Sequence, residues 1–258
     1  MEIDIALVRT WAQQAGDMLL RSYFNQVSPE RKLDKSLVTA ADRAIEDWLR
    51  AAIHAHFPDH GVLGEERDPV GLDREYIWVI DPIDGTSSFV SGLPMWAVSI
   101  GILRHGEPQA GVIYLPVLGD CYWALAGSQA FWNNDVPIQV APPQPPGPND
   151  WIAIPSTFHR AYTIHYPGKV RVLGSVAADC CYVARGQAKA AIIGKAKVWD
   201  VAAGWVIVQS AGGVVCPLEG TLPDWMTLLQ TIRLPTPVVI GHPQQVAQVC
   251  AVVQRIKP

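Results

Sequence analysis

Charged residues and long apolar runs are both scarce in this chain of 258 residues. Charged side chains form 17% of the sequence, and the formal net charge of −4 comes without any run of lysine or arginine. Such a chain offers no basic surface to nucleic acid, so we expect no nucleic-acid partner. No apolar stretch reaches the roughly 18 residues that cross a bilayer, and the start of the chain is acidic, unlike a signal peptide. The sequence therefore predicts no membrane role and a cytoplasmic location.

Patterned cysteine pairs are also absent. The five cysteines are odd in number, lie among apolar residues and form no CxxC pair; they are Cys121, Cys180, Cys181, Cys216 and Cys250. This usage favours buried free thiols over disulfides or a zinc site. Hydrophobic residues, by contrast, form 49% of the chain, and ten residues are tryptophan. A chain of this composition can bury a large core, in one domain or in two closely packed ones.

The spacing of apolar residues predicts helices and strands in the first half of the chain. Residues 3–24 have helical periodicity, and so does the stretch after Thr39, which is the predicted N-cap of a second helix. Apolar and β-branched runs at 96–103, 110–117 and 121–126 predict an antiparallel meander.

A proline-rich stretch separates the two halves. Residues 141–150 contain five prolines, so we predict a linker there between an N-terminal α+β domain, 1–140, and a C-terminal α/β domain, 151–258. The second half alternates short apolar strands with helices, and Asp200 is predicted to cap or open one of these helices.

The centre of the sequence is a pair of carboxylates that follows a strand. Residues 76–80 form a short apolar run that is typical of a buried strand. Pro82 cannot donate a ladder hydrogen bond, so the strand is predicted to stop before it. The bend would point Asp81, the Ile83 carbonyl and Asp84 at one small volume, which suits a hard divalent cation. The alternative is an ordinary acidic turn.

Further residues extend this candidate site. Gly85 and Thr86 are predicted to open a short helical turn, whose free N–H groups would accept a phosphate beside the metal. Glu65 follows a short strand and could reach the same sheet edge as another ligand, or lie in a solvated loop. Asp42 and Asp200 each have a simpler interpretation, as residues that stabilise the start of a helix.

Five strings of the sequence resemble the inositol monophosphatase family of lithium-sensitive, magnesium-dependent phosphatases. They are LVTAAD, GEE, WVIDPIDGTSSF, GSVAADCCYVARG and WDVAAGWVIVQSAGG, in the order typical of the family. The pairing of DPIDGT with WDVAAG is the most specific part, and the resemblance covers nearly the whole chain. It implies an αβαβα layered sugar-phosphatase fold, usually in a homodimer. It also implies a phosphomonoesterase that acts on inositol monophosphate or related sugar and polyol phosphates.

The resemblance also implies roles for individual residues. The metal shell would consist of Glu65, Asp81, the Ile83 carbonyl, Asp84 and Asp200. Phosphate and substrate would contact Asp84, Gly85, Thr86, Gly174, Ser175 and Ile193. Carboxylates gathered in this way repel one another, so two or three Mg²⁺ ions are expected between them. Water held near Glu65 and Thr86 would attack the phosphate, with Asp42 orienting the Thr86 hydroxyl to accept its proton.

Two departures from the family concern the substrate. Ile193 stands seven positions before Asp200, where members selective for inositol phosphates carry an acidic residue, and Lys189 stands where an aspartate is usual. We therefore expect loose discrimination among substrates. Lys195 and Lys197 are interpreted as solvated surface lysines. If either side chain pointed into the cleft, it would favour a substrate that carries a second anionic group. Alternatives are a fructose-1,6-bisphosphatase, a histidinol-phosphatase or a 3′-phosphonucleotide phosphatase, and a non-catalytic binding protein that keeps the fold.

Overall fold

The computed structural model describes residues 3–24, 29–31, 37–194 and 196–256. The helices are α1 (Ile5–Phe24), α2 (Ala40–His56), α3 (Thr86–Val90), α4 (Val176–Ala184), α5 (Val198–Ser210), α6 (Trp225–Thr231) and α7 (Pro243–Val252), with a 3₁₀ turn, η1 (Phe158–Arg160). The strands of the first half are β1 (Glu30–Arg31), β2 (Leu37–Val38), β3 (Gly61–Gly64), β4 (Tyr76–Asp84), β5 (Ala97–Arg104), β6 (Glu107–Leu115), β7 (Asp120–Leu125), β8 (Ala130–Trp132) and β9 (Val136–Ile138). The strands of the second half are β10 (Trp151–Ala153), β11 (Tyr162–Ile164), β12 (Lys169–Arg171), β13 (Ala190–Ile193), β14 (Val214–Pro217), β15 (Val238–Gly241) and β16 (Val253–Arg255).

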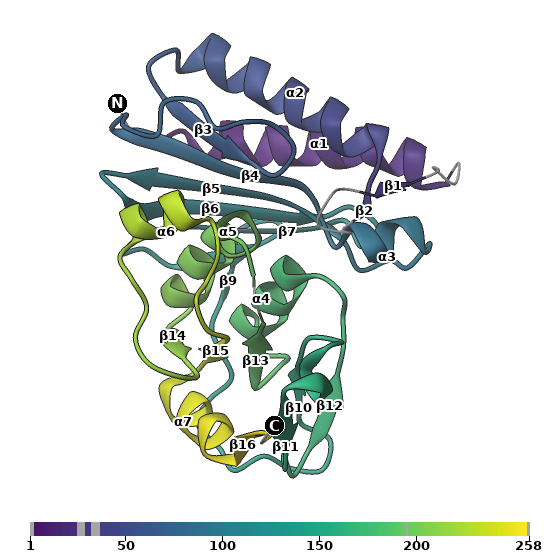
Figure 1. Cartoon of the computed structure of the whole chain (residues 1–258), viewed down its shortest axis with the longest axis vertical. Helices are drawn as coiled ribbons and strands as arrows, with labels where there is room; N and C mark the ends of the chain where they lie inside the picture. The colour runs from purple at the N-terminus through teal and green to yellow at the C-terminus, as the bar shows by residue number, and fades with distance from the viewer. Residues whose placement is uncertain (1–2, 25–28, 32–36, 195, 257–258) are drawn as a thin grey trace.

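These elements stack in five layers (Figure 1). Helices α1 and α2 cover one face of a seven-stranded sheet, and α4 and α5 lie between that sheet and a five-stranded sheet. Helix α7 packs on the outer face of the smaller sheet. The predicted αβαβα order of an α/β protein is therefore confirmed. No helix in the described part of the chain is both long and apolar enough to cross a membrane.

The first helices form where the sequence predicts them. Thr39 caps α2 through a capping box, in which its backbone N–H donates to Asp42 Oδ2 at 2.7 Å and its Oγ1 accepts from the Asp42 N–H at 3.3 Å. The reciprocal bonds satisfy backbone groups that have no partner within the helix. The N-cap prediction is confirmed, and Asp42 is fixed in the first turn of α2.

The large sheet has the order β3-β4-β5-β6-β7-β8-β9. Strands β5, β6 and β7 form the predicted antiparallel meander. Strand β4 on one side and strands β8 and β9 on the other extend it, and β3 runs parallel to β4. The predicted end of β4 is wrong, because the strand continues to Asp84. Asp81 pairs with Ser99 and Asp84 pairs with Ala97, so β4 carries one extra residue there, in a bulge. Pro82 lies within this bulge, where a missing N–H is tolerated.

Helix α5 lies close against the large sheet because two neighbouring strands carry glycine beneath it. A Cβ atom at Gly101 of β5 would come within 2.8 Å of the Ala202 Cβ, and one at Gly111 of β6 within 2.3 Å of the Ala203 carbonyl oxygen. Any side chain at these positions would push the helix away. The close approach brings the first turn of α5, with Asp200, toward the end of β4.

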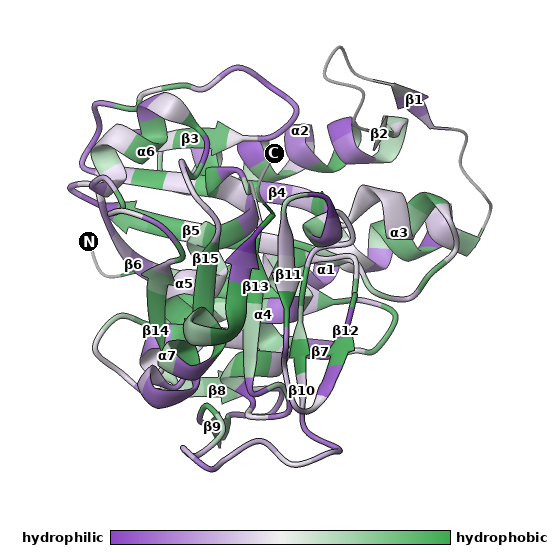
Figure 2. Cartoon of the chain, turned by 60° about the horizontal axis from the view of Figure 1, so that its bottom comes forward, coloured by the Kyte–Doolittle hydropathy of each residue, from purple (hydrophilic) through white to green (hydrophobic). Residues whose placement is uncertain are grey.

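The smaller sheet has the order β12-β10-β13-β15-β14, and its first three strands are parallel. One apolar cluster joins the halves of the chain, since it includes Ile77 and Leu115 as well as Val206 and Ile240. Figure 2 shows strands β5 and β15 in mostly hydrophobic colours, whereas several of the outer loops include hydrophilic stretches. Residues 141–150 contain no helix or strand. The division into two domains at this segment stays a prediction.

The cysteines are free thiols, as the sequence predicts. Cys121, Cys180 and Cys181 are buried, whereas Cys216 and Cys250 are half-buried.

Candidate active site

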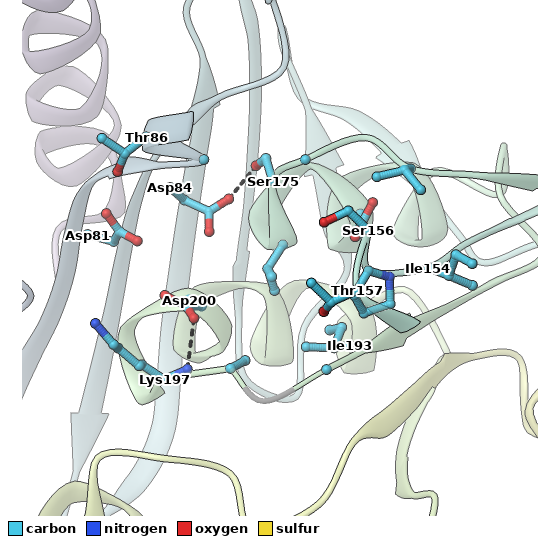
Figure 3. A pocket seen from close by; sticks show the side chains of 18 of the residues that line it. Asp81, Asp84, Thr86, Ile154, Ser156, Thr157, Ser175, Ile193, Lys197 and Asp200 are labelled. Carbon is cyan, nitrogen blue, oxygen red and sulfur yellow. Dashed lines mark hydrogen bonds between the residues drawn. The ribbon is translucent and has the colours of Figure 1, made fainter. Parts of the chain in front are cut away.

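A cavity of about 400 Å³ lies between the two halves of the chain. Its first wall consists of the end of β4, the start of α3 and the first turn of α5, and carries carboxylates. Its second wall consists of the segments that follow β10, β12 and β13. Ligands commonly bind at the carboxyl ends of parallel strands, and these three strands end at the cavity. Figure 3 shows Asp81, Asp84 and Asp200 facing Ile154, Thr157 and Ile193 across it.

Three carboxylates meet in this cavity. One oxygen from each of Asp81, Asp84 and Asp200 lies within 4.8 Å of the other two. The β4 bulge positions the first two, and a hydrogen bond of 3.0 Å from the Ile83 N–H holds Asp81 Oδ1. Asp200 sits in the first turn of α5, where its Oδ2 accepts from the Lys197 N–H at 2.8 Å. The N-cap position belongs to Lys197, so Asp200 opens the helix but does not cap it.

Desolvation and mutual repulsion oppose ionisation of these carboxyl groups. Desolvation raises the pKa of Asp84 to about 6, although hydrogen bonds from Ser175 and Ala177 lower it. Desolvation and then the Asp84 charge raise the pKa of Asp200 to about 8. The pKa of Asp81 is raised well above its usual value, first by burial and then by Glu65 and Asp84. A site with only oxygen donors and excess negative charge fits a hard divalent cation.

Asp84 is held by the start of α4. The Ser175 hydroxyl donates a short hydrogen bond to Asp84 Oδ2, and the Ala177 N–H donates to the same oxygen at 2.9 Å. Ser175 is also the N-cap of α4, and its Oγ accepts from the Ala178 N–H at 3.0 Å. Sequence analysis placed Ser175 among the substrate contacts, and the structure shows that it orients a candidate metal ligand as well.

Gly174 and Gly85 bring the phosphate side of the cavity together. Both have positive φ, at 91° and 90°, a conformation that side chains disfavour. A Cβ at Gly85 would lie 2.9 Å from the Gly174 carbonyl oxygen, so the two loops touch. Helix α3 begins at Thr86, as the sequence predicts, and Gly85 precedes it.

Asp42 and Thr86 do not form their predicted contact in this structure. The Thr86 hydroxyl donates to the Ile83 carbonyl oxygen at 3.1 Å, so this oxygen lies beside the cluster but already has a partner. Asp42 is 1% exposed and accepts from both the N–H and the hydroxyl of Thr39. Desolvation raises the pKa of Asp42 in spite of these bonds.

Glu65 and Lys197 form an ion pair at the edge of the cavity. Lys197 Nζ lies 3.2 Å from Glu65 Oε1, and the two side chains are 18% and 12% exposed. Glu65 thus lines the cavity but is not part of the group of three carboxylates. The interpretation of Lys197 as a solvated lysine is wrong, and Lys195 lies outside the described residues.

The second wall carries apolar side chains beside the hydroxyls of Ser156 and Thr157. Ile193, the last residue of β13, is 2% exposed and lines the cavity together with Ile154, Pro155 and Val172. Asp179 is a further polar lining residue that sequence reasoning missed, although it lies one helical turn after Ser175. That spacing was the available signal, because residues four apart share a helix face.

The layered fold and the acidic cluster, whose oxygens could bind a metal ion, together define an α/β protein of the sugar-phosphatase type. The model of the inositol monophosphatase family matches residues 2–256, and the chain belongs to this family.

The relatives carry several enzyme names. A histidinol-phosphatase from Chlorobaculum parvum is 38% identical over 236 residues, which cover 85% of this chain and 88% of the relative. A fructose-1,6-bisphosphatase/inositol-1-monophosphatase from Aquifex aeolicus is 34% identical, covering 79% and 81%. The crystal structure of the extragenic suppressor protein suhB from Bartonella henselae has a TM-score of 0.82 at 28% identity and covers 96% of each chain. Membership in the family makes this protein a phosphatase that hydrolyses phosphate monoesters.

Proposed function

We propose that the protein is a Mg²⁺-dependent phosphomonoesterase for inositol monophosphate or related sugar and polyol phosphates. The observation that carries this proposal is the cluster of Asp81, Asp84 and Asp200, whose oxygens lie within 4.8 Å of one another. Enclosed carboxylates in such a group are stable in the ionised form only with cations between them.

Asp81, Asp84 and Asp200 would hold the metal, with the Ile83 carbonyl and Glu65 as further ligands for a total of two or three ions. When bound, Mg²⁺ supplies positive charge that neutralises the phosphate dianion and activates water for attack. Ser175 and Ala177 keep Asp84 in one orientation through their hydrogen bonds.

Other residues of the cavity bind and position the substrate. The N–H groups of Gly85 and Thr86 at the start of α3 would donate to phosphate oxygens. The Thr86 hydroxyl, now donating to the Ile83 carbonyl, would turn to accept the proton of the attacking water while it passes its own proton to Asp42. Asp42 would orient Thr86 if its carboxylate turned away from Thr39, and its bonds to Thr39 oppose that change. Lys197 would hold Glu65 at the edge of the cavity through their ion pair.

The alcohol part of the substrate would face the second wall, with Gly174 and Ile193 on either side. An aliphatic Ile193 offers contact area but no hydrogen bond to ring hydroxyls, so discrimination among alcohols should be loose. Relatives named for fructose 1,6-bisphosphate and histidinol phosphate keep those substrates as alternatives. Inhibition by lithium, a homodimer and a cytoplasmic location are further proposals that follow from the family resemblance.

The test is phosphate release from inositol 1-phosphate, glycerol 2-phosphate, fructose 1,6-bisphosphate, histidinol phosphate and a 3′-phosphonucleotide. We expect release to require Mg²⁺, to stop in excess chelator and to return when Mg²⁺ is restored. Asp84→Asn should lose activity by orders of magnitude, whereas Asp73→Asn, at an exposed loop position, should not. Undiminished turnover in excess chelator would refute the metal mechanism. Absence of turnover on every substrate would favour a non-catalytic binding protein.

A further inference from the structure

Glu46 is a buried carboxylate that the proposed phosphatase chemistry leaves without a role. It belongs to α2, which lies over the large sheet (Figure 1), and its side chain is 0% exposed. It does not line the cavity. Its Oε1 accepts from Arg50 Nε at 2.8 Å in an ion pair. A buried ion pair usually adds little stability compared with apolar residues of the same volume, so stability alone does not explain a carboxylate here.

Both oxygens of Glu46 hold the backbone that follows Glu65. The Glu66 N–H donates to Oε2 at 2.6 Å, and the Arg67 N–H donates to Oε1 at 3.0 Å. Arg50 also donates to the Arg67 carbonyl oxygen, at 3.2 Å, so the whole ion pair contacts one turn of the chain. Hydrogen bonds to an ionised group are stronger than neutral ones. The Glu66 N–H belongs to the planar peptide unit that begins at Glu65, so Glu46 fixes the orientation of that unit.

Gly64 lets this turn lie directly on the carboxylate. A Cβ at Gly64 would stand 2.3 Å from Glu46 Oε1, whereas the φ of Gly64 is not positive. Close approach to Glu46 therefore accounts for a glycine before Glu65. Gly64 also pairs with Ile80 at the end of the parallel strands β3 and β4. The chain is thus held on both sides of Glu65, by the sheet before it and by Glu46 after it.

Glu65 projects from this turn toward the cavity, where it pairs with Lys197. We propose that Glu46 is a positioning residue, which fixes the turn that carries Glu65 and so sets how well Glu65 takes part in Mg²⁺ binding and catalysis. This inference rests on the proposed phosphatase function, in which Glu65 is a metal ligand. Loss of a partner that orients a metal ligand typically lowers metal affinity or activity by about tenfold to a hundredfold.

The test is a cycle of Glu46→Gln, Glu65→Gln and the double variant. Glutamine keeps the size of Glu46 but presents an amide NH₂ where a second acceptor is needed. In Glu46→Gln we expect Mg²⁺ affinity, measured by calorimetry without substrate, to fall by about tenfold. At saturating Mg²⁺, kcat should fall by about tenfold while the substrate KM stays within about threefold. In the Glu65→Gln background, the same substitution should change Mg²⁺ affinity by less than about twofold, because Glu46 acts through Glu65.

Asp47→Asn is the matched control, because Asp47 is the next residue of α2 and contacts the same loop. Its carboxylate accepts from the Arg67 guanidinium at 2.8 and 2.6 Å, but the two side chains are 54% and 43% exposed. This pair does not involve the loop backbone, and exposed ion pairs contribute little. Asp47→Asn should therefore keep Mg²⁺ affinity and kcat within about twofold of the wild type.

The outcomes separate this inference from the proposed function. Unchanged Mg²⁺ affinity in folded Glu46→Gln, or an equal loss in the Glu65→Gln background, would overturn the positioning role. Chelator-sensitive turnover by the wild type would then leave the phosphatase function standing, whereas turnover that survives excess chelator would overturn both. A merely structural role predicts a lower free energy of unfolding without this dependence on Glu65.

A measurement on the metal-free wild type decides the question if Glu46→Gln does not fold. Hydrogen exchange followed by NMR should show slow exchange of the Glu66 and Arg67 amides, because both donate to a fully buried carboxylate. Exchange of these two amides at the rate of unprotected groups would show that Glu46 does not hold the turn, and would overturn the inference.

Discussion

Replacement of Asp200 by asparagine should stabilise the metal-free protein, and the gain should grow with pH. The folded protein raises the pKa of Asp200 from 3.8 to about 8, so the folded state binds a proton that the unfolded chain has lost between these values. Stability therefore falls as pH rises through this window, and the penalty is absent below pH 3.8. One pKa unit corresponds to about 1.4 kcal/mol, so the penalty is about 2 kcal/mol at pH 5 and about 5 kcal/mol at pH 8.

Asparagine removes this penalty and keeps an oxygen that can accept from the Lys197 N–H, as Asp200 does at 2.8 Å. The free energy of unfolding should be measured by urea titration in excess chelator at pH 5 and pH 8. We expect the gain from Asp200→Asn to be larger at pH 8 by about 3 kcal/mol. Saturating Mg²⁺ should reverse the order of stability, because the wild type binds the ion more tightly.

Asp224→Asn is the matched control for this measurement. Asp224 also lies at the start of a helix, where it accepts from the Thr227 N–H at 2.8 Å. Hydrogen bonds from the backbone lower its pKa, so its contribution is already complete at pH 5 and is lost only in stronger acid. Asp224→Asn should lower the free energy of unfolding, and by the same amount at pH 5 and at pH 8. If Asp200→Asn raised the free energy of unfolding equally at pH 5 and pH 8, or lowered it at pH 8, charge repulsion within the carboxylate cluster would be refuted.

Three further substitutions test other parts of the site. Thr86→Ala should lower kcat by roughly a hundredfold with little change in KM, since a hydroxyl that relays a proton acts in the transition state. An unchanged steady-state kcat would remove Thr86 from the mechanism. Gly111→Ala places a Cβ 2.3 Å from the Ala203 carbonyl oxygen, so urea titration should show that the free energy of unfolding falls by about 1–3 kcal/mol. Because Asp200 moves with α5, calorimetry should also show weaker Mg²⁺ binding. Unaltered Mg²⁺ binding would contradict this coupling between the helix and the metal site. Ile193→Glu should raise kcat/KM for inositol 1-phosphate relative to an alkyl phosphate by about tenfold or more, and an unchanged ratio would exclude this position from selectivity.

The parts of the site that could be predicted from sequence depend on local chain geometry. Thr39 and Asp42 form a capping box because both side chains reach backbone groups three residues away. Asp81 and Asp84 lie together because they share the end of one strand, and the aspartate of the WDVAAG string joins them. Here residue order alone limits where the side chains can be.

The parts that sequence reasoning missed depend on contacts between distant segments. Ser175 reaches Asp84 across 91 positions of the chain, and Lys197 reaches Glu65 across 132. The orientation of Asp179 depends on how α4 packs between the sheets, and no local pattern specifies that. The end of β4 was placed too early because a bulge, unlike a regular ladder, accepts Pro82 within the strand.

The same packing that builds the core also prevents the carboxylates from separating. Asp81 and Asp84 belong to a strand that is buried along its whole length, and Asp200 belongs to a helix seated on Gly101 and Gly111. Moving any of these side chains far enough to relieve the repulsion would require movement of the core.

The repulsion between the carboxylates must therefore be relieved by a proton or a cation, and the two compete for the same oxygens. A divalent ion that bound at neutral pH would enter a site whose ligand positions are already set, so folding would have supplied the ordering that metal binding otherwise requires.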